Sequence, residues 1–216
     1  MARFILIRHG ETIWNRESRY HGQSDIPLNE EGKTQAKKLS ERLKDEKIDI
    51  VYSSDLQRAF ETAKLIAKPH LLDVNTVKEM RELSLGIWEG FTLEEIQQKW
   101  PREFAQWREN PHYVRPPGGE TICELCNRVA VFLRKIAHNN KEKNVAIVTH
   151  AGPIRALLSV ILGLEKEKFW KFKISNTSLT VLEYDGTTDL GLSDAFIVAV
   201  NDINHLGRGY LKSEKA

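Results

Sequence analysis

The 216-residue chain has few cysteines, no long apolar run and no marked excess of charge of either sign. Its 32 basic and 30 acidic residues leave a formal net charge of +2, whereas proteins that bind nucleic acid usually carry a clustered basic stripe. The apolar run at 4–7 is too short for a signal peptide or a membrane span. We therefore expect a cytoplasmic protein with neither a nucleic acid nor a membrane as its partner.

The two cysteines, Cys123 and Cys126, form a single C-x-x-C. This spacing occurs in redox and zinc sites, but neither a second cysteine pair nor closely spaced histidines accompany it here. Apolar residues recur at helical spacing through the same segment, 121–136. The sequence therefore predicts two reduced thiols on a helix.

Strand-like apolar segments alternate with segments of helical apolar spacing along the chain. Strands are predicted at 4–7, 48–52 and 145–148. Helices are predicted at 29–47, 56–66 and 153–162, and residues 53–55 are possible cap residues of the second helix. Residues 179–184 and 196–200 predict further strands, of which at least one can be antiparallel. This alternation predicts an α/β fold, a three-layer sandwich with a mostly parallel central sheet and helices on both faces.

At this length the chain can bury one good core, so we expect a single domain over 1–206 and a polar tail over 207–216. Segment 92–119 differs from its surroundings, because aromatic residues occur there beside several prolines and a Gly-Gly. We interpret it as a helical excursion followed by a loop, and as a candidate lid. The pattern leaves open whether its aromatic residues contact a substrate or pack in the core. These residues are Trp100, Phe104, Trp107 and Tyr113.

Polar residues with phosphate chemistry follow three of the predicted strands. Ligands of open α/β sheets bind beyond the carboxyl ends of the strands, so Arg8, His9, Arg58 and His150 are expected to converge. The two guanidinium groups suit phosphate oxygens and disfavour a catalytic metal ion. They also favour a neutral imidazole, which is a good phosphoryl acceptor. The residues alone leave open which histidine accepts the group.

The chain resembles the histidine phosphatase superfamily, which includes phosphoglycerate mutases, broad-specificity phosphatases and α-ribazole phosphatases. The ordered motifs span most of the chain: Arg8-His9-Gly10-Glu11-Thr12, Trp14-Asn15, Gly22 with Asp25-Ile26-Pro27-Leu28, Ser53-Ser54, Arg58-Ala59, Thr62-Ala63, Glu82-Leu83, Gly86-Ile87-Trp88-Glu89-Gly90, Gly118-Gly119-Glu120 and Thr149-His150.

The resemblance implies a role for each catalytic residue. His9 is the expected nucleophile, and Arg8, Arg58 and His150 are expected to hold the phosphoryl oxygens through transfer. Glu82 matches the family's proton donor, which protonates the leaving alkoxide and then takes a proton from the attacking water. Leu83, Leu85 and Trp88 are apolar neighbours that would favour a protonated carboxyl if they packed on it.

The resemblance also implies a set of substrate-binding residues, namely Asn15, His21, Gly22 and Ala151. His21 stands where related phosphatases often carry glutamine, so an ordinary loop histidine is the alternative. Without the resemblance, Glu11 and Glu89 compete with Glu82 for the role of acid.

Hydrolysis is the predicted reaction, because the chain is too short for the insertion that familiar phosphoglycerate mutases carry after the acid motif. Gly152-Pro153-Ile154-Arg155 and Phe169-Trp170 resemble α-ribazole phosphatases of cobalamin biosynthesis. We therefore predict a phosphomonoesterase for small phosphorylated metabolites that needs no metal or other cofactor, and that can form a homodimer. The alternatives are mutase-type phosphoryl transfer and a non-catalytic phospholigand-binding module.

Overall fold

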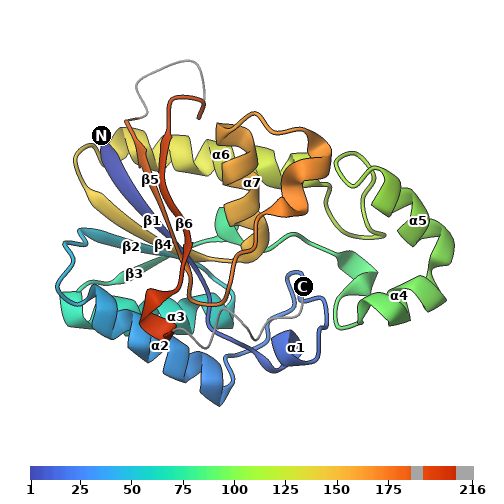
Figure 1. Ribbon diagram of the computed structural model, residues 1–216, viewed down its shortest axis with the longest axis horizontal. Coiled ribbons are helices and arrows are strands. Elements are labelled where there is room, and N and C mark those ends of the chain that lie inside the picture. The colour runs from blue at the N-terminus through green and yellow to red at the C-terminus, as the bar shows by residue number, and fades with distance from the viewer. Residues whose placement is uncertain (186–191, 208–216) are drawn as a thin grey trace.

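The computed structural model describes residues 1–185 and 192–207, which form a six-stranded sheet with helices on both faces (Figure 1). In chain order the strands are β1 (Ala2–Arg8), β2 (Ile50–Ser54), β3 (Val74–Val77), β4 (Asn144–Thr149), β5 (Leu179–Tyr184) and β6 (Phe196–Asp202). Their order in the sheet is β3-β2-β4-β1-β5-β6. The first four strands in this order pair in parallel, whereas β5 pairs with β1, and β6 with β5, in the antiparallel sense. The predicted α/β sandwich with a mostly parallel sheet is confirmed.

Two helices cover each face of the sheet, α2 and α3 on one side and α6 and α7 on the other (Figure 1). The α-helices are α1 (Ile13–Arg16), α2 (Glu30–Leu43), α3 (Gln57–Ala67), α4 (Leu93–Lys99), α5 (Pro101–Glu109), α6 (Ile122–Asn139) and α7 (Ala151–Ile161). Short 3-10 turns lie at Lys68–His70, Lys78–Met80, Gly86–Trp88, Lys166–Lys171 and Asn204–Leu206. Among the described residues, none of these helices is both long and apolar enough to cross a membrane.

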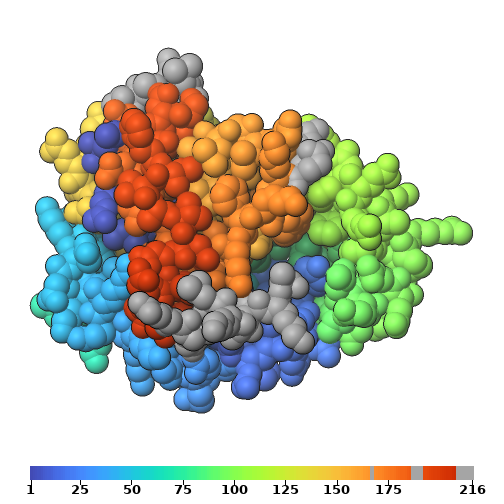
Figure 2. Space-filling view, in the orientation of Figure 1, coloured from blue at the N-terminus to red at the C-terminus, as the bar shows by residue number. Residues whose placement is uncertain are grey.

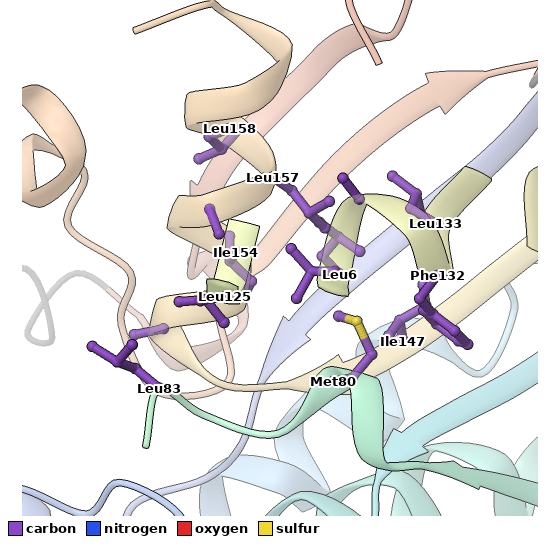
Figure 3. Packing of buried hydrophobic residues seen from close by; sticks show 14 of the residues in the cluster. Leu6, Met80, Leu83, Leu125, Phe132, Leu133, Ile147, Ile154, Leu157 and Leu158 are labelled. Carbon is purple, nitrogen blue, oxygen red and sulfur yellow. The ribbon is translucent and has the colours of Figure 1, made fainter. Parts of the chain in front are cut away.

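The side chains of the buried strand β1 pack against the helices on both faces of the sheet. Successive side chains of a strand point to opposite faces, so Phe4 and Leu6 join the larger apolar cluster with α6 and α7. Ile5 and Ile7 join the smaller cluster with α2 and α3. Leu6 packs among side chains from strand and helices in the close view of the larger cluster (Figure 3). A central strand buried on both faces therefore holds the residues that follow it in place.

Residues 92–119 form two α-helices followed by a loop, as predicted. Thr92 and Glu95 form a capping box at the start of α4, and Pro101 begins α5. Figure 2 shows this segment (green) at one end of the molecule, next to the segment around residue 170 (orange). Phe104 and Trp107 are buried, whereas Tyr113 is 61% exposed.

Three details differ from the sequence prediction. Helix α3 begins at Gln57 with Leu56 as a cap that makes no side-chain hydrogen bond, because Ser53 and Ser54 are the last residues of β2. Helix α2 ends at Leu43 rather than at residue 47. Strand β3 was not predicted, because two of its four residues are polar and exposed.

Both cysteines lie on α6 as free thiols, as predicted. The predicted tail lies outside the described residues, apart from Gly207.

Candidate active site

A pocket of about 150 Å³ opens beyond the carboxyl ends of β1 and β4. Six of the predicted site residues line it: Arg8, His9, Asn15, His21, Gly22 and Glu82. Arg58 and His150 are completely buried and do not line it, and Ala151 starts α7 without lining it. The predicted residues thus divide into those that face the pocket and those that support them.

The pairing of β1 with β4 brings the two site histidines together. Arg8 lies opposite Thr149 in the parallel register, and the backbone N–H of His9 donates to the carbonyl of Thr149 at 2.9 Å. The chain continues from this point into His150, whose ring centroid lies 5.1 Å from that of His9. Their proximity follows from parallel strands that end at the same edge.

His9 is held as a neutral imidazole with one nitrogen available for chemistry. Its Nδ1 lies 2.7 Å from the carbonyl oxygen of Gly10, which can only accept, so Nδ1 carries the proton. Burial, and then the charges of Arg58 and Arg8, lower the pKa of His9 well below its usual value. Nε2 therefore keeps a lone pair at neutral pH, which is the state that a nucleophilic histidine needs.

Arg58 organises the loop that forms one side of the pocket. Its two terminal nitrogens donate to the carbonyls of Ser24, at 2.7 Å, and Gly22, at 2.9 Å. Burial lowers its pKa to about 10. Arg58 thus acts on His9 through its charge, and its direct contact with a phosphoryl group stays a prediction. Arg8 lines the pocket and donates to the carbonyl of Ile174 at 2.6 Å.

His150 is also neutral, and it lies beside His9 rather than at the surface. Its Nε2 is 2.9 Å from the hydroxyl of Ser54, and its Nδ1 is buried without a hydrogen-bond partner in the described part of the chain. Burial, followed by the charge of Arg58, lowers its pKa well below the usual value. Its expected role in holding the phosphoryl group stays a prediction.

A polar segment before β5 holds the backbone of His9 in place. Asn176 donates from Nδ2 to the carbonyl of His9 at 3.0 Å, and the backbone N–H of Thr177 donates to the carbonyls of Arg8 and His9. Asn15, expected to contact phosphate, lines the pocket and accepts from the N–H of Thr12 at 3.0 Å. Asn176 was not predicted as a site residue, because a run of polar residues before a strand was its only signal in the sequence.

His21 belongs to the pocket wall, so it is more than an ordinary loop histidine. Its Nε2 lies 2.5 Å from the hydroxyl of Thr12, and the edge of its ring meets Trp14 with centroids 5.6 Å apart. Burial is the largest cause that lowers its pKa to about 3, and Arg58 and Arg8 add to it.

Replacing His21 with glutamine is expected to make stability less sensitive to acid. The unfolded chain binds a proton at this position below about pH 6.5, whereas the folded protein excludes it until about pH 3. Folding is therefore disfavoured as the pH falls from 6.5 towards 3, by about 1.4 kcal/mol per pH unit for this histidine. Urea unfolding at pH 7, 6, 5 and 4 should show a slope smaller by that amount in the variant. Equal slopes in the two proteins would contradict the shift.

Glu82 lies at the pocket wall beside the first turn of α7. Its carboxylate accepts from the N–H of Leu83 at 2.8 Å and from the N–H of Gly152 at 3.0 and 3.2 Å. A side chain at position 152 would place its Cβ only 2.0 Å from Oε1 of Glu82. A glycine is therefore required there for the carboxylate to occupy this place.

The two rival acids have structural roles instead. Glu89 accepts from the N–H of Gln23 at 2.9 Å and from the hydroxyl of Ser24 at 2.7 Å, so it joins two loops. Glu11 accepts from the amide of Asn29 at 2.8 Å. Neither carboxylate lines the pocket. Geometry thus separates Glu82 from the rivals that residue types alone could not rank.

A half-buried ion pair holds the backbone of Glu82 in position. Arg128 donates to the carbonyl of Glu82 at 2.9 Å and to the carboxylate of Glu120 at 2.6 Å. Glu120 also accepts from the N–H of Ser84 at 2.9 Å. Gly119 leaves room for this approach, because a Cβ there would lie 2.5 Å from the carbonyl of Ser84. The Gly-Gly-Glu motif therefore has a positioning role.

The outer part of the pocket is mainly apolar and aromatic. Leu83 and Leu85 line it, whereas Trp88 does not line it and packs edge-on against Trp107, with ring centroids 5.5 Å apart. Trp107 and Trp170 both line the pocket, with ring centroids 6.1 Å apart. Within the described residues, no group of three or more histidine, cysteine, aspartate or glutamate side chains is arranged to hold a metal ion.

Known proteins are similar to this chain in sequence and in fold. Phosphoserine phosphatase 1 of Hydrogenobacter thermophilus is 37% identical over 216 residues, the full length of both proteins. Phosphoglycerate mutase-like protein 4 of Arabidopsis thaliana is also 37% identical, over 98% of this chain and 90% of its own length. The α-ribazole phosphatase from Shigella flexneri superimposes with a TM-score of 0.82 at 27% identity, over 93% of this chain and 98% of its own.

The family model described as the histidine phosphatase superfamily (branch 1) matches residues 4–190. This range contains the nucleophile candidate His9, the acid candidate Glu82 and the buried pair Arg58 and His150. The chain is therefore an enzyme of the histidine phosphatase superfamily, branch 1.

Proposed function

We propose that the protein hydrolyses small phosphate monoesters through a phosphohistidine formed on Nε2 of His9. One observation carries the proposal. Nδ1 of His9 is committed to the carbonyl of Gly10, and the cations around the ring keep it neutral, so Nε2 alone presents a lone pair. No metal is assigned to the reaction, because the guanidinium groups supply the charge that phosphoryl transfer requires.

In the first step, Nε2 of His9 attacks phosphorus in line with the leaving oxygen. The N–P bond forms as the P–O bond to the alcohol breaks, and the oxygen leaves with the bonding electrons. Glu82 in its protonated form gives that oxygen its proton, so the alcohol departs neutral. Arg8 neutralises charge on the phosphoryl oxygens, while Arg58 and His150 act from behind the ring.

In the second step, a water molecule takes the place of the alcohol. Glu82, now a carboxylate, removes a proton from the water as its oxygen attacks phosphorus. The N–P bond breaks, its electrons return to Nε2, and inorganic phosphate is released. His9 is regenerated neutral and Glu82 protonated, so the cycle closes.

A second acceptor would turn the same site into a mutase. The similarity to phosphoglycerate mutase-like protein 4 supports this alternative, whereas the similarity to phosphoserine phosphatase 1 and to an α-ribazole phosphatase supports hydrolysis. The two reactions share the phosphohistidine and differ in whether water or a second alcohol receives the group. The α-ribazole 5'-phosphate predicted from sequence stays a candidate substrate beside phosphoserine.

Turnover of p-nitrophenyl phosphate in excess chelator tests the proposal. We expect hydrolysis at an undiminished rate, and alkali quenching during turnover of a 32P-labelled ester should leave label on the protein. Acid treatment should remove this label, because phosphohistidine is acid-labile. Ligand binding without turnover, unrestored by added divalent metal, would instead support a phospholigand-binding module.

A further inference from the structure

Arg155 is a cation on the pocket wall that the proposed reaction does not use. It lies on α7, three residues after Gly152, and its Nε donates to the carbonyl of Phe172 at 2.9 Å. Its guanidinium carbon lies 5.5 Å from the ring centre of Trp170. Two contacts, one hydrogen bond and one aromatic face, thus hold the guanidinium group in a defined place.

The two terminal nitrogens of Arg155 have no protein partner among the described residues, and they are not sealed from solvent. No carboxylate in that part of the chain forms an ion pair with this arginine either. Arg19 lines the same pocket but differs, because it donates to the carbonyl of Gly90 and to Glu95. A half-buried guanidinium group on a pocket wall, with two donors that have no acceptor in the described part of the chain, favours an anionic partner.

The position of Arg155 assigns it to the alcohol side of the substrate. Its electrostatic neighbours are Glu82, which favours its charge, and Arg8, which opposes it. Glu82 protonates the leaving oxygen in the proposed mechanism, so a pocket-lining group that interacts with Glu82 lies near the alcohol. Leu83 and Trp170 line the same outer region.

We propose that Arg155, oriented by Trp170, binds a carboxylate carried by the alcohol part of the phosphate ester. The preferred substrates are then phosphate monoesters of small hydroxy acids, among them hydroxy amino acids. The two terminal N–H groups match the two oxygens of a carboxylate, which lysine cannot reproduce. This inference rests on the proposed function, since it names the group that leaves from His9.

Matched pairs of esters test the proposal with the intact chain. O-phosphoserine and O-phosphoethanolamine differ only in the carboxylate, and 3-phosphoglycerate and glycerol 3-phosphate differ in a carboxylate against a hydroxymethyl group. We expect kcat/KM to favour the acid of each pair by about 10- to 100-fold, as a charged hydrogen-bonded pair provides. Arg155→Gln should reduce this ratio to about 1, and Arg155→Lys should retain part of it. Arg19→Gln is the matched control, and its ratio should equal that of the wild type.

Two results would overturn the subsite. One is a wild-type ratio near 1 in both pairs. The other is an equal loss on both members of each pair in Arg155→Gln and in Arg155→Lys, because Arg155 would then serve the phosphoryl group or the fold. Thermal melts of both variants identify a loss of fold. Failure of the proposed function has a separate signature, since neither ester would then be hydrolysed and no alkali-stable label would form.

Discussion

Replacing His9 with alanine is expected to lower kcat/KM by about 10⁴-fold or more, which corresponds to about 5.5 kcal/mol of transition-state stabilisation. The methyl group cannot accept phosphorus, and the remaining cations can only bind the ester. The variant should still bind inorganic phosphate, because Arg8 remains in the pocket. Steady-state rates on p-nitrophenyl phosphate would measure the loss of turnover, and alkali-quenched labelling would measure the loss of the phosphoenzyme.

His138→Ala provides the matched control, because His138 is exposed on the last turn of α6, away from the pocket. It should keep both the turnover rate and the label of the wild type. Label that persists on the His9→Ala protein would place the phosphoryl group on another residue. His150 would then be the first candidate, since the residues alone left both histidines open.

The exchange of Glu82 for glutamine is expected to have the second largest effect. The amide is isosteric and its oxygen can still accept from Leu83 and Gly152, so the fold of this wall should persist. It cannot donate a proton to a leaving alkoxide. Alkyl esters such as phosphoserine need that proton and should slow by about 10²- to 10³-fold, within the usual range for general acid catalysis. p-Nitrophenyl phosphate has a good leaving group that needs little protonation. The rate of the step in which this group leaves should therefore fall by about 10-fold at most.

Glu89→Gln distinguishes an acid from a carboxylate that orders the loops. Glu89 holds Gln23 and Ser24, so its replacement should reduce the rates on both esters by the same factor and lower thermal stability. A plot of log kcat/KM against the pKa of the leaving group should therefore steepen for Glu82→Gln and keep its slope for Glu89→Gln. A parallel shift for Glu82→Gln would argue against its role as the acid.

Much of the fold can be predicted from local pattern, because the pattern has a local cause. β1 is apolar without alternation since helices cover both of its faces, and this is visible in residues 4–7. The convergence of His9 and His150 follows from topology alone, since both come after parallel strands that are neighbours in the sheet. Strand β3 escaped prediction because its exposed residues carry no apolar signal.

The supporting contacts could not be predicted, because they join residues far apart in the chain. Glu82 and Gly152 meet across 70 positions, and Asn176 reaches His9 across 167. Nothing in the local sequence distinguishes Trp107, which lines the pocket, from Trp88, which packs behind it. The local sequence also does not indicate that the donors of Arg58 bind the loop carbonyls of Gly22 and Ser24.

The sequence by itself determined the family and most of the strands and helices around the site, and the family resemblance implied His9 as the nucleophile. These depend on the residue types and their order, which the chain carries explicitly. Only the tertiary structure decided which of three carboxylates lines the pocket and which of the cations line it. It also decided that two donors of Arg155 have no protein partner among the described residues. Those outcomes depend on how helices and loops pack, because packing alone decides which distant groups are desolvated together.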